Sequence, residues 1–571
     1  MPALQTASRR GNGLLLLGLS LGYFMVMLDT TVVTVALPAI GTDLSGSLSG
    51  LQWVSNGYTL TFAALLLTAG ALADRYGGRR VFLAGLWLFA ACSAASAPAG
   101  SIGALIALRA LLGVAGALLL PASLAVIAHA WTEPAVRARA MGVWAAISGS
   151  ALAAGPLVGG LLTDRFGWRA VFLVNVPVAL AAVVLTVRHA PVERPGPARG
   201  VDLPGQVCAV LALTGLTCAL IEGGPAGWTS LPVLGGFAVF AAAGGLFVRV
   251  ERRREAARRA PMLPLGLLRD RTLATGLCAG LLVNFGLSGV LFVLSLHFQR
   301  ADGLSALGAG LAFLPLMLPT AFNPVFTGRL VGRIGARRPA VGGFLLMGAG
   351  VLVAAAATGG STAARAAMAG GLLVLGFGLS FAIPSLMTAV VGAVAKEQAG
   401  IASGALNSAR QTGAVLGVAV LGTTADAAPD GDGTRLALLV AGLALLAGAG
   451  AVAARLGRPV GPGPDRTADG SAQLRPPAPS LSSPPALLPA AAPAFSPSDA
   501  GLANRTSRAW SATRTRLSET KSRNRAMFSS RVAAGVPGPR TETPWRAVAT
   551  TAALARALAM VAWYQMSSSS A

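Results

Sequence analysis

Apolar side chains dominate fourteen runs along the chain, and short polar stretches separate these runs. A helix of about 20 residues crosses the hydrocarbon core of a bilayer, and most of the runs approach that length. Because lipid offers the backbone no hydrogen-bond partners, the pattern predicts membrane-spanning helices. The predicted spans are 13–38, 50–72, 81–99, 101–128, 141–163, 168–188, 205–222, 231–249, 273–298, 306–328, 339–357, 364–391, 400–424 and 435–455.

The composition supports a chain embedded in lipid. Of the 571 residues, 54% are apolar and 12% are charged. A typical soluble domain carries about twice that charged share. One soluble core could not bury so much apolar surface, which excludes an ordinary cytosolic enzyme.

The basic residues indicate an orientation. With Arg9 and Arg10 in the cytoplasm, the inner loops carry 21 Lys and Arg residues and the outer loops carry 5. This asymmetry follows the positive-inside rule and favours an even number of spans. We therefore expect a protein of the plasma or inner membrane with both termini in the cytoplasm. The net charge of +24 then reflects topology, and we expect no nucleic-acid partner.

A weak internal repeat divides the chain into halves. Residues 70–80 (GALADRYGGRR) recur as residues 328–338 (GRLVGRIGARR), each after the second span of a six-helix block. Two related halves around an insert are typical of transporters. The expected parts are a cytoplasmic N-terminus (1–12), a six-helix bundle (13–188), two inserted helices with a basic loop (189–272), a second six-helix bundle (273–456) and a disordered basic cytoplasmic tail (457–571).

Two charged residues interrupt apolar spans. Asp29 lies in the first span and Arg109 in the fourth, where a charge costs about 2.5–3.5 kcal/mol on insertion scales. Apolar surroundings favour the neutral form of a carboxyl group, so Asp29 can exchange a proton. The alternative is an aspartate that only holds helices together. Arg109 keeps its proton, so it must face a cavity, a carboxylate or backbone carbonyl groups.

A third group of polar residues lies in the thirteenth span. Asn407, Arg410 and Gln411 are close enough in sequence to form a local polar network that lines a cavity. The chain shows no nucleotide-binding loop, metal-ligand cluster or nucleophile–base pair. We therefore expect a protein that is not an enzyme, holds no metal or cofactor and does not draw its energy from ATP, so that a proton gradient, used through proton exchange at Asp29, is the expected energy source.

Several motifs resemble the major facilitator superfamily, and together they resemble its fourteen-span drug:proton antiporter-2 family. Residues 70–83 (GALADRYGGRRVFL) are similar to the loop signature between the second and third helices, 142–160 (GVWAAISGSALAAGPLVGG) to the fifth-helix antiporter motif and 28–38 (LDTTVVTVALP) to the first-helix motif. Residues 167–177 and 402–417 also look like that family. The resemblance implies an all-α fold in which two six-helix bundles rock around a central cavity.

The resemblance also implies roles for the motif residues. It implies a cytoplasmic gate of charges, made in one state of the carrier and broken in the other, that comprises Gly70, Asp74, Arg75, Gly77, Arg79 and Arg80. Plain positive-inside charge is the alternative. It also implies a hinge and a seal against leak at Gly155, Pro156, Gly159 and Gly160. The alternative for these four residues is close helix packing without gating. Arg109 would tune the proton site.

Three positions depart from the family pattern. Leu112 stands where the fourth-helix motif usually has Gln, and Ala151 stands where the fifth-helix motif usually has Gly. Gly332 in the second loop occupies the place of Asp74 in the first. The first departure removes a polar contact of the proton or substrate route, and the third makes the two loops electrostatically unequal.

The expected function is export of a small amphipathic compound, cationic or neutral, by a monomer that admits protons in exchange. Three alternatives remain open. They are a narrow-range exporter of a metabolite or antibiotic made by the host cell, a proton-driven nutrient importer, and a non-transporting sensor or scaffold that acts through residues 457–571.

Overall fold

The structure is a computed structural model that describes residues 2–191, 202–257, 261–359, 361–395, 398–427 and 432–457. The predicted tail beyond Gly457 and parts of the basic loop between residues 189 and 272 lie outside the described residues.

Every regular element in these ranges is a helix, so the predicted all-α fold class is confirmed. The elements are α1 (Pro2–Asp43), α2 (Leu48–Tyr76), α3 (Gly78–Ser96), α4 (Ile102–Ala130), α5 (Pro134–Phe166), α6 (Ala170–Leu173), α7 (Asn175–His189), α8 (Leu203–Glu222), α9 (Leu231–Ala256), η1 (Leu265–Arg269), α10 (Arg271–Leu296), η2 (His297–Ala301), α11 (Ala306–Ala312), α12 (Leu314–Ile334), α13 (Arg337–Ala356), α14 (Thr362–Gly392), α15 (Ala399–Asp426) and α16 (Asp432–Arg455).

All fourteen predicted runs lie on these helices, and two of the runs are broken. The sixth run forms α6 and α7, and the tenth forms α11 and α12, which meet at 46°. Eleven described helices are long and apolar enough to cross a membrane, or twelve if the bent pair counts as one span. Helices α3 and α15 are not among them, because α3 begins with two arginines and polar side chains interrupt α15. The count of fourteen spans therefore stays a prediction.

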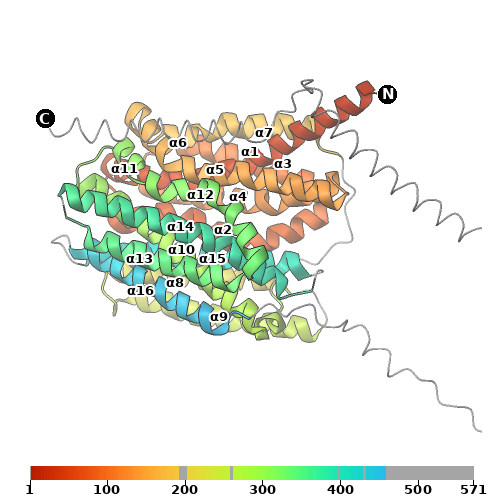
Figure 1. Cartoon of the computed structure of the whole chain (residues 1–571). Coiled ribbons are helices and arrows are strands. Elements are labelled where there is room, and N and C mark those ends of the chain that lie inside the picture. The colour runs from red at the N-terminus through yellow and green to blue at the C-terminus, as the bar shows by residue number, and fades with distance from the viewer. Residues whose placement is uncertain are drawn as a thin grey trace, which may run out of the picture. The chain divides into compact units, whose positions relative to one another are not determined.

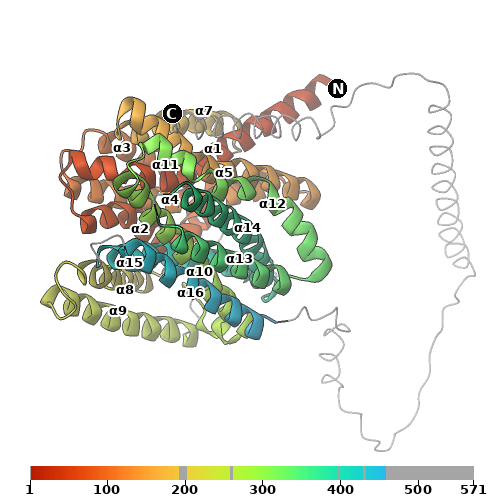
Figure 2. The ribbon, with the colours of Figure 1, turned by 60° about the vertical axis from the view of Figure 1, so that its left-hand side comes forward.

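The long helices lie side by side (Figure 1). In the first half α1 packs against α5 and α7, and α2 packs against α4. In the second half α10 packs against α15 and α16, and α13 packs against α14. The inserted helices α8 and α9 pack on each other, and α8 also contacts α2 and α15 (Figure 2). One inserted helix thus touches both halves.

Small residues allow the helices to approach closely. A Cβ added at Gly57 of α2 would lie 3.2 Å from the Ile106 carbonyl oxygen of α4. One added at Gly343 of α13 would lie 2.8 Å from the Gly378 carbonyl oxygen of α14. Backbone contact through glycine is typical of helix pairs in membranes, where van der Waals packing rather than the hydrophobic effect drives association.

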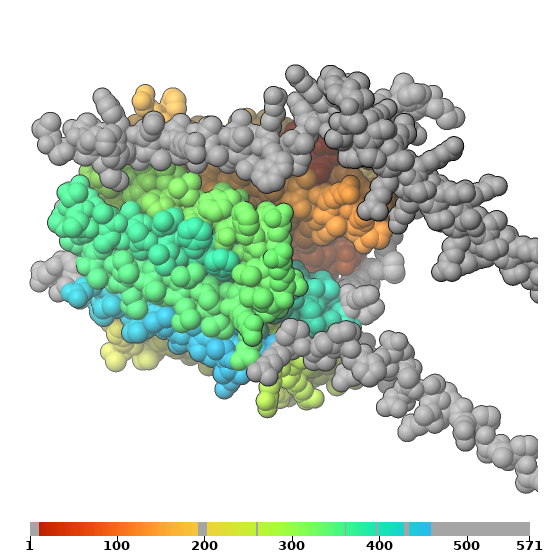
Figure 3. All heavy atoms as spheres, viewed as in Figure 1, coloured from red at the N-terminus to blue at the C-terminus, as the bar shows by residue number. Residues whose placement is uncertain are grey.

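Large apolar side chains cover the outside of the bundle. On α12, Phe322, Val325 and Phe326 are 49%, 63% and 56% exposed. Helices α12 to α14 form the broad green face in Figure 3. A soluble monomer rarely exposes apolar patches of this kind, whereas lipid tails cover them at no cost.

Candidate functional site

A buried ion pair joins the first and fourth helices. Arg109 Nη1 of α4 donates to Asp29 Oδ2 of α1, and each residue is 1% exposed. Neither charge reaches lipid. A buried charge is tolerated when an opposite charge and hydrogen bonds compensate it. The structure therefore answers the question that the sequence left open, because Arg109 faces a carboxylate.

Both partners of the pair make further hydrogen bonds. Asn175 Nδ2 of α7 donates to Asp29 Oδ1 over 3.1 Å and also lies 3.1 Å from Ser93 Oγ of α3. Arg109 Nε donates to the Val54 carbonyl oxygen of α2 over 3.1 Å. The Arg109 guanidinium lies 4.5 Å from the centroid of the Tyr58 ring. The Asp29 carboxyl group thus connects α1 to α3, α4 and α7.

Sequence reasoning singled out none of the residues around the pair individually. Asn175 carried a signal, since it is an amide inside an apolar run. Tyr58 and Ser93 carried none, because hydroxyl groups are easily satisfied within membrane helices. Ser93 illustrates this, because its Oγ donates to the Phe172 carbonyl oxygen over 3.1 Å.

A cavity of about 120 Å³ lies between the two halves. Its first-half wall includes Tyr23, Thr30 and Thr31 of α1, and its second-half wall includes Asn284 of α10 and Arg410 of α15. Asp29 does not line this cavity, although the residue that follows it does. Helix α1 therefore presents the ion pair on one face and the cavity wall on another.

The three polar residues predicted on α15 all line this cavity. Arg410 Nε donates to Asn284 Oδ1 over 3.3 Å, and Arg410 Nη1 donates to Asn407 Oδ1 over 3.4 Å. Asn284 Nδ2 in turn donates to Gln411 Oε1 over 3.4 Å. The predicted local network thus extends to Asn284 on α10.

The glycine motif of α5 lies against both halves. An added Cβ at Gly155 would collide with the Thr31 hydroxyl, and one at Gly159 would lie 2.7 Å from the Val32 carbonyl oxygen, both on α1. One at Gly160 would collide with the Ala306 carbonyl oxygen of α11. Pro156 of α5 also contacts α11, because a Cβ added at Gly310 of α11 would collide with the Pro156 carbonyl oxygen. The motif is therefore a close-packing surface.

An acidic side chain fastens the same contact. The Asp164 carboxylate at the end of α5 accepts the N–H groups of Ala306 over 3.1 Å and Leu307 over 2.9 Å. These N–H groups begin α11, where a carboxylate also interacts favourably with the helix dipole. The two halves are thus joined at the end of the bundle that holds Asp43, which we call the Asp43 end.

The predicted gate lies at the opposite end, which we call the Asp74 end. Asp74, Arg75 and Arg80 are exposed, and Asp74 makes no ion pair or hydrogen bond with a described residue. Arg79 Nη2 donates to the Val187 carbonyl oxygen over 3.0 Å. Asp74 lines a pocket of about 490 Å³ that shares Asn407 with the central cavity. Within the described residues, Asp74 therefore forms no ion pair with the arginines of the gate motif in this conformation.

Two glycines of the gate motif behave differently. Gly77 has a φ of +90° and its N–H caps the Ala73 carbonyl oxygen at the end of α2, as expected for a glycine in that conformation. Gly70 makes no tight contact, because an added Cβ would lie 3.9 Å from Pro121 Cβ. A close contact between helices occurs at the neighbouring Gly78, where an added Cβ would lie 3.0 Å from the Ala122 carbonyl oxygen.

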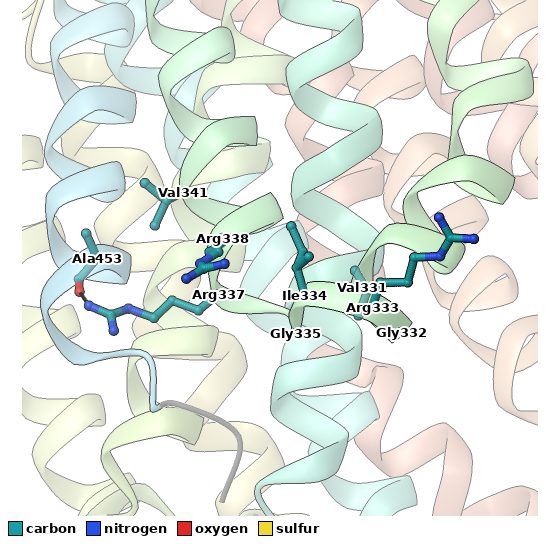
Figure 4. A pocket seen from close by; sticks show the side chains of 9 residues that line it. All are labelled: Val331, Gly332, Arg333, Ile334, Gly335, Arg337, Arg338, Val341 and Ala453. Carbon is teal, nitrogen blue, oxygen red and sulfur yellow. Dashed lines mark hydrogen bonds between the residues drawn. The ribbon is translucent and has the colours of Figure 1, made fainter. Parts of the chain in front are cut away.

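The internal repeat has a structural counterpart. Gly335 has a φ of +78° and caps α12 as Gly77 caps α2. Arg337 donates to the Ala453 carbonyl oxygen of α16, the last helix of the second half (Figure 4). Arg79 makes the equivalent bond to α7, the last helix of the first half. Arginine at a helix C-terminus satisfies a terminal carbonyl group and favours the helix dipole.

A polar cluster that the sequence did not single out attaches the inserted helices. Arg254 Nε of α9 lies 2.8 Å from Asp202 Oδ2, and Glu251 Oε2 accepts the Leu263 N–H over 3.2 Å. Gln206 of α8 bonds to Thr68 and to the Ala64 carbonyl oxygen of α2. Their sequence signal is weak, because these residues lie at span ends where charge is common.

Comparison with known proteins gives one family. The model of the Major Facilitator Superfamily matches residues 19–418. The chain is 34% identical to a methylenomycin A resistance protein of Streptomyces coelicolor over 76% of this chain and 91% of the relative. It is 36% identical to the multidrug resistance protein Stp of Mycobacterium tuberculosis over 72% of this chain and 75% of the relative.

A solved structure supports the fold. The nucleoside transporter NupG aligns with a TM-score of 0.54 and 14% identity, over 77% of this chain and 99% of that protein. The family match extends through both halves, from α1 to α15, and includes the buried pair, the α5 glycines and the cavity residues. The chain therefore belongs to the Major Facilitator Superfamily and is a multi-span membrane transporter.

Proposed function

We propose that the chain exports small amphipathic, drug-like compounds across the cell membrane in exchange for protons, by alternating access and as a monomer. The observation that carries this proposal is the position of Asp29. It lies on α1, bound to Arg109, directly before residues that line the cavity between the halves. A single helix therefore links a protonatable group to the compartment in which a substrate would bind.

Protonation of Asp29 is the coupling step in this proposal. A neutral carboxyl group loses its charge interaction with Arg109, so the contact between α1 and α4 weakens. Thr30 and Thr31 then move with α1, which changes the cavity wall. Asp29 takes a proton from outside as the substrate leaves and releases it inside as a new substrate enters. The proton gradient supplies the energy, and no cofactor is needed.

The two ends of the bundle fit the proposed cycle. The halves meet at the Asp43 end through Gly160 of α5 and through Asp164. The pocket of about 490 Å³ lies at the Asp74 end. The excess of basic residues in the loops on that side favours a cytoplasmic location. We assign the described conformation to a state that is closed to the outside.

The relatives support an exporter and leave its range open. One is named for resistance to methylenomycin A and another for multidrug resistance. Export of one antibiotic is therefore the second candidate. A resistance panel in a sensitive host separates the two, since a broad pump protects against several unrelated compounds and a narrow one against a single class.

An efflux assay tests the proposal. Cells that express the full chain are loaded with a panel of dyes and antibiotics, and efflux is followed with and without an uncoupler. We expect efflux that stops when the uncoupler collapses the proton gradient. Efflux that continues at the same rate would reject proton coupling.

Removal of residues 458–571 tests the scaffold alternative. This deletion leaves the whole described bundle in place. A transporter keeps its uncoupler-sensitive efflux after the deletion. A tail-driven scaffold loses its effect.

A further inference from the structure

The central cavity contains one arginine that no acidic side chain neutralises within the described residues. Arg410 lines the cavity, whose wall includes neither Asp nor Glu. Its described hydrogen-bond partners are two amide oxygens, on Asn284 and Asn407, at 3.3 and 3.4 Å. Neutral amides at such distances compensate a guanidinium only weakly.

Arg109 provides an internal comparison. It also lies within the apolar spans, but it has a carboxylate, a backbone carbonyl group and the face of an aromatic ring as partners. Arg410 has no ion pair, and no hydrogen bond joins its Nη2 to a described residue. A guanidinium has five N–H donors in a fixed fork, so Arg410 retains donors for a ligand.

The cavity wall also carries an aromatic surface. Tyr23 on the cavity wall stacks on Trp144, with ring centroids 4.8 Å apart and planes at 9°. An aromatic surface on the cavity wall suits a ligand with an aromatic or apolar body.

Asp29, which directly precedes a residue of the cavity wall, is already paired with Arg109. The acids of the adjoining pocket are Asp74 and Asp202. Arg254 already pairs with Asp202. Asp74 lies near the cytoplasmic mouth of this pocket in our proposal, whereas Arg410 lies on the cavity between the halves. A bound cation would therefore meet an uncompensated positive charge at the centre of the molecule.

We infer that Arg410 selects substrates that carry an anionic oxygen group, such as a carboxylate or an ionised phenol, on an aromatic or apolar body. The inference rests on the proposed function, because it takes this cavity as the transport site. The anion accepts hydrogen bonds from the Arg410 N–H groups that bind no described residue. A drug-sized ligand needs about 300 Å³ or more, so its body extends into the pocket of about 490 Å³ that shares Asn407. This selection excludes the cationic compounds that the sequence led us to expect.

Direct binding tests the inference without requiring transport. The full chain is purified in detergent, and fluorescence anisotropy follows the binding of two xanthene dyes of similar size. Fluorescein carries a carboxylate and an ionised phenol, and tetramethylrhodamine methyl ester is a cation. We expect saturable binding of fluorescein that is at least about tenfold tighter than binding of the cation.

Three variants of Arg410 make the test specific. R410Q should weaken fluorescein binding about tenfold or more, R410K should retain part of it, and R410E should reverse the preference toward the cationic dye. Arg300, which is exposed at the Asp43 end, provides the matched control, and R300Q should bind both dyes as the wild type does. The inference is overturned if the wild type does not bind fluorescein, or if R410Q binds it as tightly as the wild type does. It is also overturned if the wild type binds the cationic dye more tightly.

The same dyes separate this inference from the proposed function. If vesicles bind fluorescein through Arg410 but a pH gradient moves none of it, the proposed antiport fails and the binding preference stands. If a pH gradient drives transport of the cation alone, antiport stands and the role of Arg410 is wrong.

Discussion

Asp29 and Arg109 stabilise each other because neither charge could remain alone where it lies. Both are buried among helices, and Asn175 holds the second oxygen of the carboxylate. A buried ion pair adds little net stability compared with apolar residues of the same shape, but removal of one partner costs about 3–5 kcal/mol. The pair is thus better suited to a switch than to a permanent support.

Arg109→Gln should therefore lower the melting temperature of the purified protein more than the double variant D29N/R109Q does. The single change leaves the Asp29 carboxylate buried without its cation, at a cost of about 3–5 kcal/mol, whereas the double change removes both charges. The difference is measured by heating the purified protein in detergent and determining, by size-exclusion chromatography, the fraction that remains folded at each temperature. Equal melting temperatures would show that the two residues do not interact energetically.

The charged residues were predictable because a charge inside an apolar run is costly and therefore conspicuous. Their contact was not, because it depends on how α1, α4 and α7 are rotated about their axes. Asn407 and Gln411 were assigned from their proximity to Arg410. Asn284 was one of several isolated polar residues within the spans, and its place in this network depends on the packing of a distant helix. Tyr58 acts through its ring face, which no spacing in the sequence reveals.

At the scale of elements, α5 is one of the helices that join the halves, and α2, which packs on α15, is another. Gly155 and Gly159 contact α1, and Gly160 contacts α11. A side chain at these positions would meet backbone or β-branched atoms that cannot rotate away. Because α1 also carries Asp29, the α5 surface and the ion pair are parts of one packed unit.

Gly160→Val should abolish most transport, because the added side chain would strike the Ala306 backbone of α11. Overpacking of this kind costs about 1–3 kcal/mol or more. Gly149→Val on the same helix is the matched control, because nothing lies within 4 Å of a Cβ added there. Uptake into inverted vesicles measures both variants. Wild-type rates for Gly160→Val would mean that this contact does not form during the cycle.

Helix positions followed the apolar pattern, but helix breaks did not. The tenth run reads as one span, yet it bends by 46° between α11 and α12. Pro315 provides a local reason, since it lacks an N–H group and is preferred in the first turn of a helix. Near the gate motif, the close contact between helices is at Gly78, which was not among the predicted gate residues, and Gly70 makes no such contact. Such contacts depend on the neighbouring helix, so the sequence of one segment does not predict them.

For the whole molecule, the central question is which end of the cavity opens. The two halves are fastened at the Asp43 end by Asp164, which caps α11. The Asp74 end holds the pocket of about 490 Å³ and a gate aspartate without a partner among the described residues. The internal repeat predicted the two halves. Its equivalent residues Arg79 and Arg337 each bind the last helix of their own half. The direction of opening was not predictable, because one sequence encodes both states.

Asp164→Ala should loosen the closure at the Asp43 end. Ser288 on the cavity wall is replaced by Cys in a chain whose four native cysteines are changed to Ser. A membrane-impermeant maleimide added to intact cells should label this cysteine several-fold faster in the Asp164→Ala background. Asp43→Ala is the control, because Asp43 pairs with Arg169 inside the first half. Equal labelling in both backgrounds would contradict a seal at Asp164.

The account depends most on proton exchange at Asp29, and transport driven by a pH gradient in reconstituted vesicles measures it directly. A substrate found in the efflux assay is supplied on the cytoplasmic side, and its uptake is compared with and without the gradient for the wild type and Asp29→Asn. We predict that the gradient accelerates the wild type about tenfold or more and leaves Asp29→Asn at its gradient-free rate. A variant that responds to the gradient as the wild type does would contradict the account.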